Sequence, residues 1–172
     1  MSIIKTKMFI LRPFKNGDEA ALIKNINNEK VYRPTLHIPY PYTMKHAREW
    51  IEKNENFAKE KPLRSVNFVI EIKGEVAGGI GISKIEKNEG ELGYWLGENY
   101  WGKGIMSGAV NEVTNFGFKT LKLKRIYADV FPFNKVSMRV LEKNGYKLEK
   151  ILKNNTVKDG ELLDDHRFSK TV

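Results

Sequence analysis

Residues 91–107 read Glu-Leu-Gly-Tyr-Trp-Leu-Gly-Glu-Asn-Tyr-Trp-Gly-Lys-Gly-Ile-Met-Ser. The run Glu91–Leu96 is rich in aromatic and aliphatic residues and predicts a short strand. Gly102 and Gly104 then flank a lysine just before the amphipathic run Ile105–Thr120, which predicts a helix. The first turn of a helix has N–H groups without an internal partner, and the helix dipole is positive there. The segment therefore predicts an anion site suited to a pyrophosphate.

A flexible loop is the alternative explanation of the Gly-Lys-Gly sequence, because paired glycines are common in loops. The position of this sequence between a predicted strand and a predicted helix favours the phosphate site. Glycine also lets the backbone approach a ligand closely, which a phosphate site requires.

The rest of the chain alternates strand-like and helical patterns without a repeat or a linker. The predicted strands are Met8–Arg12, Val66–Ile72, Val76–Ile85, Leu92–Leu96, Arg125–Val130, Leu148–Asn155 and Leu162–Ser169. The predicted helices are Asp18–Asn27, Thr43 to about Glu60, Ile105–Thr120 and Asn134–Asn144. Lys73-Gly74 and Asp159-Gly160 predict hairpin turns, and Asn28–Tyr42 is expected to be a long connection. Helices between strands indicate an α/β (α+β) fold.

The composition fits a single catalytic domain spanning residues 1–172. That length suffices for one core and is too short for two ordinary domains. A hydrophobic content of 41% and an aromatic content of 11% exclude a disordered chain. No apolar run approaches the roughly 20 residues that span a bilayer, and the first residues do not resemble a secretory signal. With no cysteine there is no disulfide or thiol nucleophile, and we expect a cytoplasmic protein.

The net charge is +9, from 30 Lys+Arg against 21 Asp+Glu. One interpretation is attraction to anions such as coenzyme A, ribosomal RNA or an acidic protein surface. The other is a set of solvated basic faces, because the lysines are spread along the chain and form no dense tract.

Three motifs carry a resemblance to a known family: Gly93–Leu96 with Tyr100–Ser107, then Arg125–Ala128, then Asn134–Tyr146. They are similar to the acetyl-CoA loop and the following motifs of the GNAT superfamily of N-acetyltransferases. Within it, the chain is most similar to the RimJ and RimL branch of ribosomal-protein N-terminal acetyltransferases. One departure is Asn99, where the superfamily usually has Gln or Arg.

The resemblance implies the GNAT fold, with a mixed, mostly antiparallel central sheet of about seven strands and about four flanking helices. Two central strands would splay apart, and acetyl-CoA would enter the gap. The backbone of Tyr94 and Leu96, in the strand that also holds Trp95, would pair with the pantetheine arm. The pyrophosphate would be held by main-chain N–H groups in the segment made of Trp101, Gly102, Lys103, Gly104, Ile105, Met106 and Ser107.

Asn134 and Ser137 open the helix that follows the second splayed strand. Asparagine before an amphipathic run is a good helix cap, and a serine in the first turn is common, so a purely structural role is open. The resemblance implies that Asn134 contacts the pantetheine arm. It also implies that Ser137 lies near the sulfur, where it can protonate the leaving thiolate.

Glu91 is the candidate general base, because several members of the resembling family use a carboxylate at the start of this strand. The alternative is a solvated charge at a strand end. His37, His46 and His166 stand alone in the sequence, so we expect no metal site.

The leading interpretation is an acetyl-CoA-dependent acyltransferase that acetylates a primary amine, such as a protein N-terminal α-amine, by direct attack in a ternary complex. A second interpretation keeps this chemistry with a small acceptor such as a polyamine, an amino acid or an aminoglycoside. The third is a non-catalytic module associated with the ribosome or RNA, although no RNA-binding motif is present. We expect no membrane partner and no specific nucleic-acid binding. Both a monomer and a homodimer fit the sequence.

Overall fold

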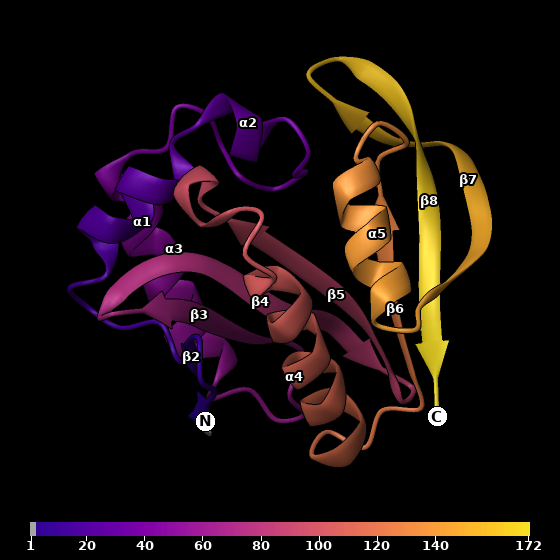
Figure 1. Ribbon diagram of the computed structural model, residues 1–172, viewed down its shortest axis with the longest axis horizontal. Helices are drawn as coiled ribbons and strands as arrows, with labels where there is room; N and C mark the ends of the chain where they lie inside the picture. The colour runs from indigo at the N-terminus through magenta and orange to yellow at the C-terminus, as the bar shows by residue number, and fades with distance from the viewer. Residues whose placement is uncertain (1–2) are drawn as a thin grey trace.

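In the computed structural model, which describes residues 3–172, eight strands form one sheet in the order β1-β2-β3-β4-β5-β6-β8-β7 (Figure 1). The strands are β1 (Ile4–Lys5), β2 (Ile10–Arg12), β3 (Val66–Ile72), β4 (Glu75–Glu86), β5 (Glu89–Leu96), β6 (Arg125–Val130), β7 (Lys147–Lys158) and β8 (Glu161–Thr171). The helices are α1 (Glu19–Ile26), α2 (Glu29–Tyr32), α3 (Met44–Phe57), α4 (Ile105–Lys119) and α5 (Lys135–Lys143), with a 3₁₀ turn η1 (Glu98–Tyr100). Every pair of neighbours is antiparallel except β5 and β6, which run parallel.

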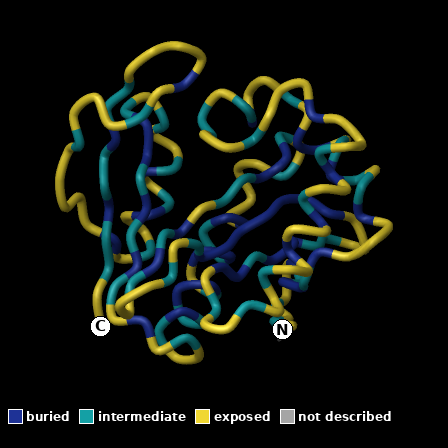
Figure 2. The backbone as a smooth tube through the Cα atoms, turned by 180° about the vertical axis from the view of Figure 1, so that it is seen from behind, coloured by how far each residue is buried: buried dark blue, intermediate teal, exposed yellow. Residues whose placement is uncertain are grey.

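Helices cover both faces of the sheet, and the strands divide their side chains between them. In β5, Leu92 and Leu96 belong to the core cluster under α4 and α5, whereas Trp95 packs against the cluster under α1 and α3. This division follows from the alternation of side chains along a strand. Figure 2 shows that buried residues are concentrated along the central strands.

The helix α4 forms where the sequence repeats apolar residues at helical spacing. Its buried side chains include Ile105, Ala109, Val110 and Val113, which recur on one face of the helix. They pack against the sheet beside β5, so the start of α4 is held next to the end of that strand. The packing of this face therefore fixes the position of the glycine loop.

The parallel pair β5–β6 is joined over only three register positions, from Glu89–Arg125 to Glu91–Tyr127. Beyond that point the two strands separate, and Figure 1 shows them starting together at the bottom of the view and diverging upward. The predicted splay of two central strands is thus present. Its upper end lies between α2 and the turn that joins β7 to β8.

Most of the predicted elements are confirmed, with three differences. The short strand β1 pairs with β2, and the one-turn helix α2 lies inside the predicted connection Asn28–Tyr42. The last hairpin is longer than predicted, because pairing extends to Lys158–Glu161 on either side of the Asp159-Gly160 turn. A helix of one turn has little periodicity to detect; here Asn28 caps it by accepting a hydrogen bond from Lys30 N at 2.9 Å.

A substitution of Gly78 in β4 tests how closely β4 and β5 pack. A Cβ at Gly78 would lie 2.5 Å from the carbonyl oxygen of Trp95, whereas a Cβ at Gly93 in β5 would meet nothing within 4 Å. We expect Gly78→Ala to lower the free energy of unfolding by about 1–3 kcal/mol, because the backbone of β5 must move. The matched control, Gly93→Ala, should stay within about 0.5 kcal/mol of the parent. Equal effects of the two changes in denaturant unfolding would contradict this packing.

Candidate active site

The main-chain N–H and C=O groups of β5 point alternately toward β4 and toward β6, and this alternation decides which of them face the opening. Gly97 N, just after β5, donates to Ala77 O of β4 at 2.8 Å, and Arg125 N of β6 donates to Asn88 O, just before β5, at 3.3 Å. Main-chain groups of successive strand residues point to opposite sides. Odd-numbered residues of β5 therefore direct their N–H and C=O groups toward β4, and even-numbered residues direct theirs toward β6.

Tyr94 and Leu96 lie beyond the last β5–β6 pair, Glu91–Tyr127, so their main-chain groups point into the opening. One of these groups already has a partner, because the indole Nε1 of Trp101 donates to Leu96 O at 2.7 Å. This bond ties the loop after β5 to the end of the strand. The remaining groups form the edge to which an extended ligand can add.

The start of α4 presents main-chain donors with no side-chain cap. Gly104 is the capping residue, and the first intrahelical bond runs from Gly108 N to Gly104 O at 3.0 Å. The N–H groups that precede Gly108 in the helix therefore lack an intrahelical acceptor. Gly102 and Gly104 have φ values of 72° and 74°, and a Cβ at either would meet nothing within 4 Å. An anion can thus reach the helix start directly.

The other residues of this loop and helix start have identifiable positions. The Lys103 ammonium donates to Asn99 O at 2.8 Å and is exposed, at the outer side of the loop. The Ile105 and Met106 side chains are buried in the core, so only their main chain can face a ligand. The Ser107 hydroxyl accepts a hydrogen bond from the side chain of Asn144, the residue after α5, at 3.2 Å.

Two hydroxyl groups meet across the opening. The Tyr94 hydroxyl of β5 lies 2.7 Å from Ser137 Oγ, in the first turn of α5. Asn134 caps this helix by accepting a hydrogen bond from Ser137 N at 3.2 Å. Burial raises the pKa of the Tyr94 hydroxyl, so it stays protonated at neutral pH and can donate. The sequence motif pointed to Ser137 and to the Tyr94 backbone; the hydroxyl pair was not predicted.

Glu91 lies on the other face of the sheet, at the base of the opening. One of its carboxylate oxygens is 2.5 Å from the Lys84 ammonium, and this pairing raises the pKa of Lys84. The same oxygen is buried and has no partner of good hydrogen-bond geometry among residues 3–172. Nearby on this face, Arg167 of β8 holds Asp129 of β6 through two bonds of 2.6 and 2.7 Å, and its guanidinium lies over the Tyr127 ring.

The helix α2 is anchored to the end of β5. Asn28 Nδ2 donates to Glu98 of η1 at 2.8 Å, and the Lys30 ammonium contacts the other oxygen of the same carboxylate. This double attachment to one carboxylate ties α2 to the strand that carries Tyr94.

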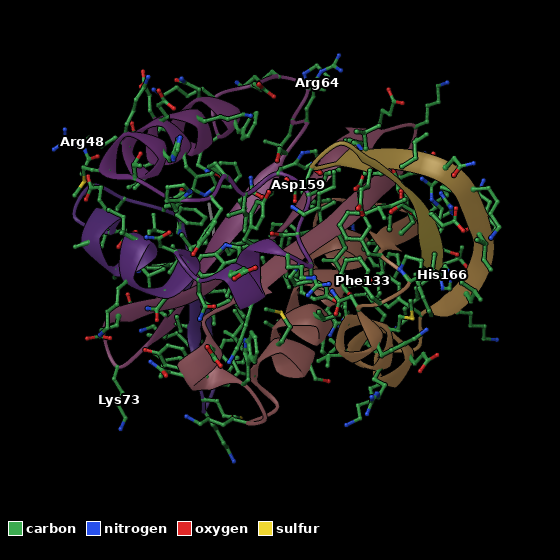
Figure 3. The ribbon with its side chains drawn as sticks, turned by 90° about the horizontal axis from the view of Figure 1, so that it is seen from above. Arg48, Arg64, Lys73, Phe133, Asp159 and His166 are labelled. Carbon is green, nitrogen blue, oxygen red and sulfur yellow. The ribbon has the colours of Figure 1, made fainter. Side chains whose placement is uncertain are left out.

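From this anchor, the chain crosses the upper end of the opening. The Tyr32 hydroxyl donates to the Asp159 carboxylate in the β7–β8 turn, and the Arg33 guanidinium lies 5.9 Å from the ring of Phe133, which precedes α5. Figure 3, seen from above, shows Phe133 and Asp159 over the middle of the molecule. We call the segment 28–40 the roof, because it joins both sides of the opening.

Not every predicted residue faces the opening. The main-chain groups of Trp95 point toward β4 and its side chain packs toward α1 and α3, so a cofactor contact of this residue stays a prediction without geometric support. His46 caps α3 through its contact with Thr43, and His166 pairs in register with Val130 and Ile151. Among residues 3–172, no group of three or more His, Cys, Asp or Glu side chains could hold a metal ion. Within the same residues, no helix is long and apolar enough to cross a membrane.

Comparison with known proteins identifies the family. The acetyltransferase (GNAT) domain family matches residues 9–147. The uncharacterized N-acetyltransferase p20 of Bacillus licheniformis is 29% identical over 171 residues, which are 98% of this chain and 96% of that protein. The spermidine N(1)-acetyltransferase of Escherichia coli K12 is 26% identical over 142 residues, 81% of this chain and 73% of that protein.

Among solved structures, a RimL ribosomal L7/L12 α-N-protein acetyltransferase in complex with CoA superposes with a TM-score of 0.90 at 22% identity, over 99% of this chain and 98% of that one. This match shows that the two chains share the same fold. The family match extends over well more than half of the chain, from β2 to the start of β7. The chain therefore belongs to the acetyltransferase (GNAT) family and is an N-acetyltransferase, with acetyl-CoA as its acetyl donor.

Proposed function

We propose that this enzyme acetylates the α-amine of a peptide or protein N-terminus, by direct attack of the amine on acetyl-CoA in a ternary complex. The observation that carries the proposal is the opening between β5 and β6. The main-chain groups of Tyr94 and Leu96 point into this opening. The face of the sheet under α4 lies on one side of it, and Glu91 lies on the other face. Donor and acceptor can then meet from opposite sides of one gap.

The donor would lie along β5 with its phosphates at α4. The pantetheine arm would add to Tyr94 and Leu96 as an extra strand, and the amide NH₂ of Asn134 stays available to donate to it. The pyrophosphate would accept from the N–H groups at the start of α4, assisted by the charge of Lys103. Main-chain N–H groups in the gap would also stabilise the oxyanion that forms at the thioester carbonyl oxygen when the amine attacks the carbon.

The leaving thiolate would be protonated by Ser137. The Tyr94 hydroxyl can donate to Ser137 Oγ, which leaves the serine proton free to point at the sulfur. A thiol titrates near pH 8.5, so the thiolate is a moderate base and needs only modest assistance. We therefore assign Tyr94 a positioning role and Ser137 the proton transfer.

The charges on the acceptor face favour an α-amine over a polyamine. A polycation needs unpaired carboxylates, yet Glu91 lies beside Lys84, and Asp129 is held by Arg167. Deprotonation also favours the α-amine, because an amine that titrates near 8 costs roughly 1–1.5 kcal/mol to deprotonate at pH 7 and a lysine about 4–5 kcal/mol. The Glu91 carboxylate, whose buried oxygen contacts Lys84, is the proposed proton acceptor, directly or through water.

A small acceptor is the second candidate, and the roof is the observation that favours it. The contacts of Tyr32 with Asp159 and of Arg33 with Phe133 cover the upper end of the opening. The similarity to a spermidine acetyltransferase points the same way. A peptide would need an exit beside the roof, whereas a small amine would not.

The phosphate site is tested by Gly104→Val, with Gly74→Val as the matched control. Both residues have positive φ, 74° and 83°, and both have open space around a Cβ, so each change should cost about 1–3 kcal/mol of stability. Acetyl-CoA at a hundred times its Kd should stabilise the parent and Gly74→Val by about 2.7 kcal/mol. It should leave Gly104→Val unchanged, because the side chain occupies the phosphate space. Equal stabilisation of all three proteins in thermal unfolding would refute this site.

The hydroxyl pair is tested by a double-mutant cycle of Tyr94→Phe and Ser137→Ala. Each change should lower kcat by roughly tens of fold, and the double variant should be little worse than Ser137→Ala, because both act on one proton transfer. Affinity for acetyl-CoA should not change. The control is Tyr146→Phe, which removes another buried hydroxyl, 2.8 Å from Thr114, and should leave kcat unchanged. Additive losses in the cycle would show that the two hydroxyls act separately.

The acceptor is tested with peptides that differ only in which amine is free. A free α-amine should react about a hundredfold faster than a lysine ε-amine, since the two differ by roughly 3 kcal/mol in deprotonation cost. Acetylating the peptide N-terminus beforehand should remove nearly all CoA release. If the blocked, lysine-containing peptide or spermidine is acetylated faster than the peptide with a free α-amine, the proposed α-amine specificity is wrong. Faster acetylation of spermidine would favour a small acceptor.

A further inference from the structure

A lysine that is almost completely buried ends β7, beside the roof. Lys158 is 8% exposed, although lysine is rarely buried without a charged partner. Among residues 3–172, no carboxylate oxygen lies within the 4.0 Å of a salt bridge to its ammonium. Burial lowers the pKa of Lys158, although the nearby charge of Asp159 acts in the opposite direction.

The ammonium is held against an aromatic ring. Its Nζ lies 3.7 Å from the centroid of Tyr32, whose hydroxyl is bonded to Asp159. The Tyr32 ring also stacks with Tyr40, at 5.3 Å between centroids. This contact fixes where the charge sits but supplies no oxygen acceptor for its N–H groups.

Lys158 also lines an open pocket of about 400 Å³. The pocket lies between the roof and the end of the β7–β8 hairpin, and its lining includes Tyr32, His37, Tyr40, Val157, Lys158 and Asp159. A hollow of similar size on α3 is lined by that helix and the turn after it, and its buried unpaired group is a carboxylate oxygen of Glu60, not a cation. The pocket beside the roof thus combines a fixed cation, aromatic walls and access from solvent.

We propose that this pocket is an anion subsite of the acceptor, in which Lys158 binds a carboxylate carried by the molecule that is acetylated. The inference rests on the proposed function, because it takes the opening beneath the roof as the acceptor site. A carboxylate would give the Lys158 ammonium the charged acceptor it lacks, and charge-assisted hydrogen bonds are among the strong ones. The carboxylate is an acidic side chain of a peptide or the α-carboxylate of a free amino acid.

The first experiment compares steady-state acetylation of two C-terminally amidated peptides, Ser-Asp-Gly-Phe and Ser-Asn-Gly-Phe, and of free serine. Lys158→Met keeps the length of the side chain and removes its charge. The control is Lys153→Met, also on β7, where the exposed lysine pairs with Asp164 at 2.7 Å. If the carboxylate is a peptide side chain, Lys158→Met should raise KM for the acidic peptide about tenfold, with kcat and the KM of the neutral peptide within about twofold. If it is an α-carboxylate, the KM of free serine should rise instead.

The result that overturns the subsite is an equal effect of Lys158→Met on acidic, neutral and free-serine acceptors, since loss of packing on Tyr32 would produce it. Lys153→Met should leave all three KM values within about twofold of the parent.

A binding measurement separates failure of the subsite from failure of the proposed function. Calorimetric titration of the N-acetylated acidic peptide, which is the product, requires no catalysis. Tighter binding than that of the neutral product, lost in Lys158→Met, supports the subsite even if no peptide is turned over. Equal binding of both peptide products to the parent enzyme, together with an unchanged KM of free serine in Lys158→Met, overturns the subsite; if the enzyme acetylates α-amines, the proposed function stays intact.

Discussion

The separation of β5 from β6 is the constraint on which the rest of the structure depends. A parallel pair that stopped after Glu91–Tyr127 without compensation would leave main-chain donors and acceptors unsatisfied inside the protein, which is costly. The chain limits this cost at one point, where the indole Nε1 of Trp101 donates to Leu96 O. The remaining groups need a ligand or water. An extended amide-bearing arm such as pantetheine satisfies that need, which is why a gap in a sheet can serve as a binding site.

The two faces of the sheet carry different kinds of polar groups. The face under α4 and α5 offers neutral donors: helix N–H groups, a strand edge and a hydroxyl pair, all suited to an anionic donor with a thiolate leaving group. The other face carries charges that largely neutralise one another, as with Asp129 and Arg167. Under the proposed function, an acceptor amine that enters there would approach the Glu91 carboxylate, which is paired with Lys84. Lys158 beside the roof would add a positive charge, so the proposed acceptor face would disfavour a polycation.

Local patterns predicted much of this arrangement, because they depend on neighbours in sequence. Apolar spacing predicted α4, and Asp159-Gly160 predicted the last hairpin. The paired glycines both have positive φ at the start of α4, and the anion site that they indicate stays a prediction. The resemblance to a family supplied the splay. What was missed depends on contacts between distant residues: Tyr94 with Ser137, Tyr32 with Asp159, and Lys84 with Glu91 across a hairpin. A pattern within one segment cannot show which hydroxyl or charge another segment will bring, and the one-turn helix α2 is too short to have a period.

The central claim is that CoA binds along the edge of β5 that faces the opening, and amide hydrogen exchange within β5 tests it most directly. Neighbouring residues of the strand point their N–H groups to opposite sides, so the claim predicts opposite behaviour for them. Gly93 and Trp95 direct their N–H groups to β4 and should be protected with or without ligand. Tyr94 and Leu96 direct theirs into the opening, and their exchange should slow markedly when CoA binds, together with the first amides of α4. Protection that appears at Gly93 and Trp95 instead, or no change in β5 at saturating CoA, would contradict the account.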